Sequence, residues 1–182
     1  KKLADDGCTP PTTQALGNAK GAWFEWIVAI SGWNLLAKKK DTYSVLLLPN
    51  KTQLQLPALF NEATESLLTD LYNHLHRAQA ELQTSNPDMI LVMQDLSKIK
   101  KLGLKSTLEW DKAVSLSAVD GIHKEFLGKL SPHDLKAGIG IKTSTRPDRR
   151  LQLIHEGNVV KALIAHLQTR VWDTSFKTRY FV

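Results

Sequence analysis

The sequence predicts an α/β or α+β fold in which helices flank a mixed β-sheet. Helical and strand-like patterns alternate along the 182 residues, and such alternation is typical of sheets covered by helices. Hydrophobic residues make up 42% and charged residues 23% of the chain, which excludes disordered, collagen-like and coiled-coil classes. The length suits one core, so we expect residues 1–182 to form a single domain.

Two helices and two strands are expected in the first half of the chain. The almost wholly apolar residues 21–37 end at three lysines, which favour a helix C-terminus, and therefore predict a buried helix. Residues 43–48 predict a strand, and leucines at helical spacing predict an amphipathic helix over 58–82. The apolar run 89–93, which follows the loop Thr84-Ser85-Asn86-Pro87, has the length of a strand.

The second half continues this alternation. Residues 96–132 predict helices with polar breaks, 138–143 a strand, 150–169 a long helix and 179–182 the start of another strand. Because Val182 stands within that last strand, we expect the chain to be a fragment that lacks C-terminal elements of its fold.

The net charge of +6 is concentrated near the C-terminus. Residues 133–182 hold nine Lys or Arg and four Asp or Glu, a net charge of +5, which favours a polyanionic partner, although basic segments also serve solubility. No apolar run approaches the roughly 20 residues that cross a bilayer, so no membrane span is expected. The single cysteine, Cys8, closes no internal disulfide, which predicts a reducing compartment such as the cytoplasm.

Two glutamates stand where core residues are expected. Glu25 is the only charged residue between Lys20 and Lys38, and burying an unpaired carboxylate is costly. Glu156 shares one helix face with the apolar residues Leu153, Val160, Leu163 and Leu167. A salt bridge explains either glutamate as well as a functional role does, and for Glu25 a helix edge near water is a further explanation.

Asp88 and Lys142 complete a chemical set with these glutamates. Strand alternation places Gly138, Gly140 and Lys142 on one face, which suits either a closely approaching ligand or an exposed edge strand. Asp88 opens the apolar run 89–93 directly after Pro87. Two carboxylates can hold Mg²⁺, and a neighbouring lysine can orient or deprotonate water, as metal-assisted phosphodiester hydrolysis requires.

A basic cluster directly follows Lys142, with the sequence Thr143-Ser144-Thr145-Arg146-Pro147-Asp148-Arg149-Arg150. Arginine forks match guanine O6 and N7, and aspartate accepts from cytosine N4. Arg146, Asp148, Arg149 and Arg150 are therefore candidate readers of G·C pairs. The alternative is a helix start at which Asp148 is the cap and the arginines are solvated.

Six segments occur in a characteristic order. They are Gly21-Ala22-Trp23-Phe24-Glu25-Trp26, Ser85-Asn86-Pro87-Asp88, Ile141-Lys142-Thr143, Arg146-Pro147-Asp148-Arg149-Arg150-Leu151-Gln152-Leu153, His155-Glu156-Gly157 and Ala165-His166-Leu167-Gln168-Thr169-Arg170. In order and spacing they resemble the NgoMIV-like type II restriction endonucleases that cut CCGG-centred sites, a branch of the PD-(D/E)XK nuclease superfamily. The resemblance runs through nearly the whole chain from Gly17, and the block from Lys142 to Arg170 is its most specific part.

The resemblance implies a Mg²⁺-dependent nuclease with a restriction-endonuclease-like core in a bacterial or archaeal cell. Such an enzyme breaks both strands of DNA at a CCGG-containing palindrome and leaves 5′-phosphate ends. By resemblance, Asp88 and Glu156 ligate Mg²⁺, Lys142 acts at the attacking water, and Glu25 serves a second metal or its waters. The basic cluster, above all Arg146, Asp148 and Arg149, would read the CCGG core from the major groove.

The sequence departs from the family pattern in two ways. The superfamily usually has an acidic residue two places before the lysine, where Gly140 stands here. The branch takes that carboxylate from the following helix, as at Glu156, but its members carry serine at the position of Gly140. Family chains also extend beyond the position of Val182 and have a longer N-terminal segment.

Assembly and activity follow from the resemblance only as expectations. Family members are homodimers or homotetramers, and Arg170 and Trp172 fall in a region that helps form such contacts, although core packing explains Trp172 equally well. The alternative function is sequence-specific DNA binding without cleavage. A third possibility is a PD-(D/E)XK nuclease of the repair type, which reads DNA structure rather than sequence.

Overall fold

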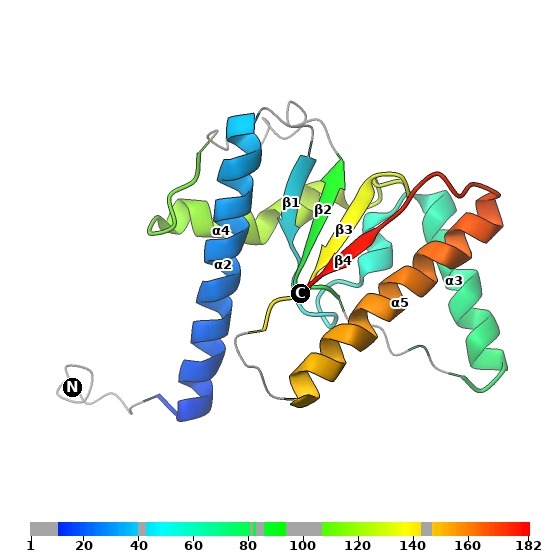
Figure 1. Cartoon of the computed structure of the whole chain (residues 1–182), viewed down its shortest axis with the longest axis horizontal. Coiled ribbons are helices and arrows are strands. Elements are labelled where there is room, and N and C mark those ends of the chain that lie inside the picture. Colours follow the sequence, from blue (N-terminus) through cyan, green and yellow to red (C-terminus); the bar gives the residue numbers. More distant parts are fainter. Residues whose placement is uncertain (1–10, 40–42, 81, 83–85, 94–106, 143–146) are drawn as a thin grey trace.

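The computed structural model describes residues 11–39, 43–80, 82, 86–93, 107–142 and 147–182. Four strands form one sheet in the order β1-β2-β3-β4: β1 (Tyr43–Leu47), β2 (Met89–Met93), β3 (Leu135–Ile139) and β4 (Arg179–Phe181). Four α-helices flank the sheet (Figure 1): α2 (Thr13–Lys39), α3 (Glu62–Arg77), α4 (Ala113–Gly121) and α5 (Pro147–Val171). The predicted class, a mixed sheet flanked by helices, is confirmed.

The sheet is mixed because its last strand runs parallel to its neighbour. β1 pairs antiparallel with β2, and β2 pairs antiparallel with β3, so that Met89 lies between Leu47 and Ile139. β4 pairs parallel with β3, which places Tyr180 opposite Gly138. The strands expected at 43–48, 89–93 and 179–182 are confirmed to within a residue at their ends.

The strand expected over 138–143 is wrong in its bounds. β3 begins at Leu135 and ends at Ile139, so Lys142 lies beyond the strand. Leu135 and Ala137 are the buried residues of its first half. The Gly-Ile-Gly-Ile alternation suggested a later strand, but the ladder hydrogen bonds with β2 end at Ile139.

The helix expected over 21–37 is longer than predicted and only partly buried. α2 begins near Thr12, whose side-chain oxygen accepts a hydrogen bond from the Ala15 amide (3.2 Å). Its core contacts come from Ala29, Ile30 and Trp33, whereas several apolar side chains of the same helix are exposed: Leu16, Trp23, Phe24, Ile27 and Leu35. The uniform apolar sequence therefore does not mean a helix buried on all sides.

The helix expected over 58–82 is shorter than predicted, because α3 begins at Glu62 and ends at Arg77. Residues Leu56–Leu59 form a short 3-10 helix, η1, which contains Pro57. A new start follows at Asn61, whose side chain accepts a hydrogen bond from the Thr64 amide (3.0 Å) and so caps α3. Of the segment 96–132, residues 96–106 lie outside the described part, and the rest contains α4 and the 3-10 helix η3 (Ile122–Phe126).

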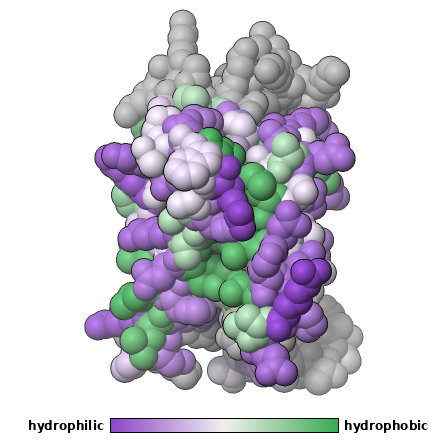
Figure 2. Space-filling view, turned by 90° about the vertical axis from the view of Figure 1, so that its right-hand side faces the viewer, coloured by the Kyte–Doolittle hydropathy of each residue, from purple (hydrophilic) through white to green (hydrophobic). Residues whose placement is uncertain are grey.

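The long C-terminal helix begins earlier than expected. α5 starts at Pro147 rather than Arg150, since a proline fits the first helical position, where its missing N–H costs nothing. The predicted inward face is confirmed, because Val160, Leu163 and Leu167 are buried and Glu156 lies among them. The side of the molecule that carries α3 and α5 shows a central band of hydrophobic residues between hydrophilic ones (Figure 2).

No helix within the described residues is long and apolar enough to cross a membrane.

Candidate active site

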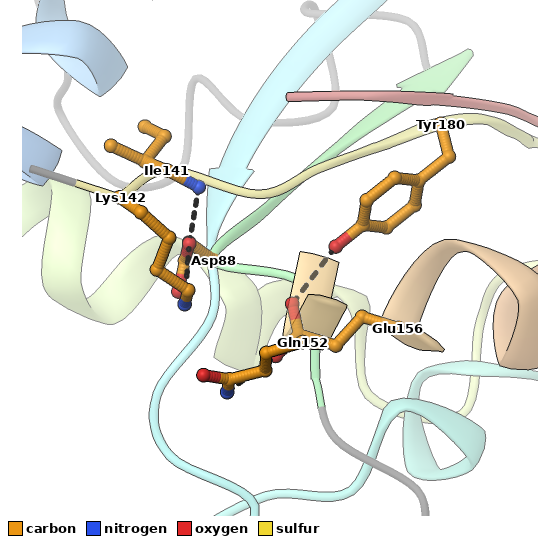
Figure 3. A network of polar contacts seen from close by, with 6 residues as sticks. All are labelled: Asp88, Ile141, Lys142, Gln152, Glu156 and Tyr180. Atoms are coloured by element: carbon orange, nitrogen blue, oxygen red, sulfur yellow. Dashed lines mark hydrogen bonds and ion pairs between the residues drawn. The ribbon is translucent and has the colours of Figure 1, made fainter. Parts of the chain in front are cut away.

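Asp88 stands directly before β2, where it joins three parts of the chain. Its carbonyl oxygen accepts a hydrogen bond from the Leu48 amide (3.0 Å), which extends the pairing of β1 and β2. Its Oδ2 accepts a hydrogen bond from the Ile141 amide and lies 3.5 Å from Lys142 Nζ. The Asp88 and Lys142 side chains are only 18% and 19% exposed. The acid and the lysine predicted from separate motifs therefore form one ion pair (Figure 3).

Glu156 is the most deeply buried charged residue of this region, with 2% of its surface exposed. Its Oε1 accepts a hydrogen bond from Gln152 Nε2 (2.8 Å), one helical turn earlier on α5. Its Oε2 accepts a hydrogen bond from the Tyr180 hydroxyl (3.1 Å) on β4. No Lys or Arg among the described residues forms a salt bridge with Glu156. Among the described residues, the salt-bridge explanation of Glu156 is therefore wrong, because two neutral donors, Gln152 and Tyr180, hold its carboxylate.

Glu25 approaches the same site from α2. Its half-buried side chain lines a hollow of about 530 Å³ together with Trp26, Pro49, Asn50, Asp120, His123 and Lys124. Trp26 Nε1 donates a hydrogen bond to Asp120 Oδ1 (2.7 Å), which ties α2 to α4 on one wall of the hollow. Glu25 forms no salt bridge within 4.0 Å among the described residues. Of the explanations left open, a helix edge that faces open space fits best.

The carboxylates influence one another's protonation. Burial raises the pKa of Asp88 above its usual value, and the charge of Glu156 raises it further, against the lowering effects of the Ile141 amide and Lys142. Burial also raises the pKa of Glu25, as does the charge of Asp88, while Lys142 lowers it. Asp88 and Glu25 thus share one lysine, while Glu156 adds its charge near Asp88, and this surplus of negative charge favours a bound cation.

Asp88 and Glu156 are the two mostly buried carboxylates of this region that could hold a magnesium ion. Mg²⁺ is usually held by one or two carboxylates, and waters and phosphate oxygens complete its shell. Within the described part of the chain, no three His, Cys, Asp or Glu side chains gather into a group that could hold one ion. Glu25 therefore does not form one compact group with the other two acids, and its role at a second metal stays a prediction.

The predicted DNA-reading residues lie only partly within the described structure. Arg146 lies outside the described residues, and so does the side chain of Arg149. Asp148 and Arg150 are exposed in the first turn of α5. Because the helix starts at Pro147, Asp148 is not the residue that precedes it, and its predicted place at the cap is wrong. The amides of this helix start are themselves suited to bind phosphate.

Asn86 is a supporting residue whose role the sequence did not reveal. Its side-chain nitrogen donates hydrogen bonds to the carbonyls of Pro49 (3.0 Å) and Leu54 (2.5 Å), and its oxygen accepts one from the Leu56 amide (3.0 Å). This asparagine thereby fastens the chain that follows β1 beside Asp88. Its place in the motif, two residues before the aspartate, was the available signal.

Tyr180 and Gln152 are the other two residues that sequence reasoning missed. Tyr180 also bears on the two explanations offered for the strand face that carries Gly138 and Gly140. Because β3 pairs on both sides, with β2 and with β4, it is not an exposed edge. The space beside Gly138 and Gly140 is not open to a ligand either, because the Tyr180 ring fills it. Both predicted explanations of the glycine face are therefore wrong.

Fold and site together define a class, the type II restriction endonucleases with a PD-(D/E)XK-like site. An acid before one central strand, a lysine after the next and a glutamate on the following helix form this pattern. The description "Cfr10I/Bse634I restriction endonuclease" belongs to the family model that matches residues 1–182. The chain is a member of this family.

Individual relatives agree with this assignment. The chain is 32% identical over 164 residues to the type II restriction enzyme Cfr10I of Citrobacter freundii, a match that covers 87% of this chain and 56% of Cfr10I. The crystal structure of the type IIF restriction endonuclease Bse634I with cognate DNA superposes with a TM-score of 0.85 at 34% identity. That match covers 98% of this chain and 62% of the Bse634I chain. A second Bse634I structure gives the same TM-score of 0.85 at 35% identity.

The predicted restriction-endonuclease identity is confirmed at the level of this family. Assignment to the NgoMIV-like CCGG branch stays a prediction. The chain spans less than two thirds of the length of the relatives that it matches.

Proposed function

We propose that the protein is a type II site-specific deoxyribonuclease that uses Mg²⁺ to hydrolyse both strands of DNA at a CCGG-containing palindrome. One observation carries the proposal: Asp88, Lys142 and Glu156, from three separate parts of the fold, come together in a mostly buried site. The family supports nuclease chemistry, and the Bse634I structure with its cognate DNA supports double-stranded DNA as the partner.

The chemistry follows from the roles of these residues. Asp88 and Glu156 are the side chains that would hold Mg²⁺, which when bound stabilises charge on the phosphoryl oxygens and makes water more acidic. Lys142, held beside Asp88 Oδ2, orients the attacking water and offsets the negative charge that grows at phosphorus. The water oxygen bonds to phosphorus while the bond to the 3′ oxygen breaks. The products are a 5′-phosphate and a 3′-hydroxyl.

Glu25 has an accessory role in this proposal. Its carboxylate lines the hollow beside the site, and its pKa responds to both Asp88 and Lys142. It would serve a second cation, or the waters around one. Because it stands apart from the other acids, replacing it should slow cleavage less than replacing Asp88 does.

Recognition of the site is assigned to the start of α5. Arg146 and Arg149 would each bind a guanine through O6 and N7, Asp148 would accept from cytosine N4, and Arg150 would contact a base or a phosphate. The exposure of Asp148 and Arg150 supports this assignment. The proposal that the recognised bases are CCGG depends on the order Arg-Pro-Asp-Arg-Arg in the sequence.

Assembly as a homodimer or homotetramer belongs to the same proposal, as does an origin in the bacterial or archaeal cytoplasm. Trp172 is 94% exposed, so its explanation as a core residue is wrong. An exposed indole beside exposed Arg170 at the end of α5 suits a contact between subunits. Light scattering after gel filtration should give a mass at least twice that of one chain, and a smaller mass for Trp172→Ala.

Plasmid digestion tests the proposed activity. Incubation with Mg²⁺ should linearise a plasmid that carries one target site, and EDTA should prevent the cut. Asp88→Ala should bind the same DNA without cutting it. Unchanged cutting by Asp88→Ala would remove Asp88 from the mechanism, whereas binding without any cutting by the unmodified protein would favour the DNA-binding alternative.

A further inference from the structure

Three glycines enclose the ring of Tyr180: Gly138 on β3, Gly140 just after it and Gly157 on α5. A Cβ atom added at Gly138 would lie 2.9 Å from Tyr180 Cδ2, and one added at Gly157 would lie 2.9 Å from Cδ1. A Cβ added at Gly140 would lie 2.7 Å from the Tyr180 hydroxyl oxygen and 2.6 Å from Leu153 Cδ2. Real Cβ atoms almost never approach so closely. The absence of side chains at these three positions therefore creates the slot that the tyrosine fills.

The slot directs the hydroxyl of Tyr180 to one target. The ring is held in register because β4 pairs with β3 at Gly138, and the Gly140 amide donates a hydrogen bond to the Phe181 carbonyl (2.9 Å). From this position the hydroxyl donates to Glu156 Oε2 (3.1 Å), while Gln152 donates to Oε1 (2.8 Å). Both oxygens of the buried carboxylate thus have a fixed donor (Figure 3).

Gly140 is also the position that lies two residues before Lys142. In the PD-(D/E)XK pattern that position carries a polar side chain. Here the Tyr180 hydroxyl lies so close to residue 140 that a Cβ atom at that residue would collide with it. A polar group is therefore still present, but it comes from β4, 40 positions later in the sequence.

We propose that Tyr180 is a positioning residue for the metal site, in which a ring locked between Gly138, Gly140 and Gly157 holds the Glu156 carboxylate in the orientation that binds the cation. This inference depends on the proposed role of Glu156 as a ligand. Partners of metal-binding side chains fix the geometry of those ligands, and their loss typically lowers metal affinity or activity about 10–100-fold. The ring provides packing and the hydroxyl provides the alignment.

Tyr180→Phe separates these two contributions, because it keeps the ring and removes only the hydroxyl. The first measurement is the binding of a fluorescent CCGG duplex, followed by anisotropy while CaCl₂ is added. The concentration of Ca²⁺ at half-saturation should rise about tenfold, the lower end of the usual effect of such partners. The Mg²⁺ concentration for half-maximal cleavage should rise by a similar factor, whereas the rate at saturating Mg²⁺ should change less.

Tyr72→Phe is the matched control. Tyr72 is a half-buried tyrosine on α3, and its hydroxyl has no hydrogen-bond partner among the described residues. It should leave both cation dependences unchanged. Equal cation dependence in Tyr180→Phe and in the parent protein would overturn the inference, and so would equal shifts in Tyr180→Phe and Tyr72→Phe.

Gly140→Ser tests the slot itself. The new side chain must displace the Tyr180 hydroxyl, so the single variant should show a raised Ca²⁺ requirement. Tyr180→Phe removes the contact with the hydroxyl and leaves only the contact with the end of the Leu153 side chain. In that background, adding the serine should therefore raise the Ca²⁺ requirement less than it does in the parent. If Gly140→Ser raises the Ca²⁺ requirement equally in both backgrounds, the Tyr180 hydroxyl does not limit the space at residue 140.

Glu156→Ala distinguishes the two levels of the proposal. If Glu156→Ala leaves the cation dependence of DNA binding unchanged, the proposed metal site fails. If Glu156→Ala changes this dependence and Tyr180→Phe does not, only the inference about Tyr180 fails.

Discussion

Two neighbouring regions of the molecule, the end of the sheet at Asp88 and the first turn of α5, are constructed differently. At the sheet end, Asp88, Lys142 and Glu156 are mostly buried, and each is held by contacts from another part of the fold. At the start of α5, Asp148 and Arg150 are exposed.

The contrast shows what each task requires. Chemistry on phosphorus needs polar groups that are already in place, because a fixed group costs no reorganisation during the reaction. Base reading needs side chains that enter a groove, and these must therefore be accessible in the free protein. Variants at the sheet end should change cleavage more than binding, and variants at the helix start should change which DNA is bound.

The largest expected effect is on cleavage by Lys142→Ala. Removing the group that acts at the attacking water should slow single-turnover cleavage about 10²–10⁴-fold. Binding to a CCGG duplex in Ca²⁺ should change much less. Lys161→Ala, at an exposed lysine of α5, is the control and should cut normally. Cleavage by Lys142→Ala at the parent rate would show that the sheet end is not the catalytic region.

The next largest effect is on sequence preference in Arg149→Ala. The loss of a bidentate contact to guanine costs about 1–3 kcal/mol of discrimination, or roughly a 5–150-fold loss of preference for CCGG over unrelated DNA. Competition binding in Ca²⁺ measures this ratio, with the exposed Lys177→Ala as control. Equal weakening on all sequences would identify Arg149 as a phosphate contact instead.

A smaller effect is expected on stability in Gly157→Ala. The new methyl group would lie 2.9 Å from the Tyr180 ring, and overpacking of this kind costs about 1–3 kcal/mol. Gly21→Ala in α2, where nothing lies within 4 Å, should instead stabilise the protein by about 0.5–1 kcal/mol. Urea unfolding compares the two variants. Equal stability changes would mean that the slot is not tightly packed.

The smallest effect is on the pH dependence of stability. Because folding raises the pKa of Asp88 above its usual value of 3.8, the native state binds more protons than the unfolded state. Stability without metal should therefore fall as the pH rises from near 3.8 through the raised pKa, and it stays lower above it.

Asp88→Asn should remove the contribution of Asp88 to this dependence, whereas Glu25, whose pKa is also raised by burial, keeps its own contribution. The Tm of this variant without metal should exceed that of the parent by a few degrees at pH 7. The difference should shrink as the pH falls toward 3.8, the usual pKa of an aspartate. The exposed Asp111→Asn is the control. Thermal unfolding at a series of pH values measures this, and a lower Tm for Asp88→Asn at pH 7 would show that Asp88 stabilises the fold as an anion.

The candidate site residues could be selected from the sequence because each stands in a local pattern. Asp88 follows Pro87 at the start of an apolar strand, Glu156 interrupts an apolar helix face, and Lys142 follows two glycines. Local patterns also predicted β1, β2 and β4, each of which begins directly after a polar residue. These features depend on neighbours within a few positions of the chain.

The parts that the sequence did not predict depend on contacts between distant residues. The Gly138 and Gly140 face looked open because Tyr180, which fills it, arrives only when β4 pairs with β3. The full burial expected of α2 failed because an apolar pattern does not show how much of a helix its neighbours cover. The Asn86 side chain donates hydrogen bonds to carbonyls more than 30 positions earlier in the chain, and the spacing of residues within the motif does not reveal such contacts.

Sequencing the ends of digested DNA tests the central claim most directly, since it reports cleavage, position and recognised sequence together. A mixed-sequence DNA is incubated with the protein and Mg²⁺, in parallel with Lys142→Ala. We expect all ends of the parent digest to carry a 5′-phosphate and to map to one CCGG-containing palindrome, and the variant to produce almost none. Ends that map to sequences without CCGG, or equal numbers of ends from Lys142→Ala, would contradict it.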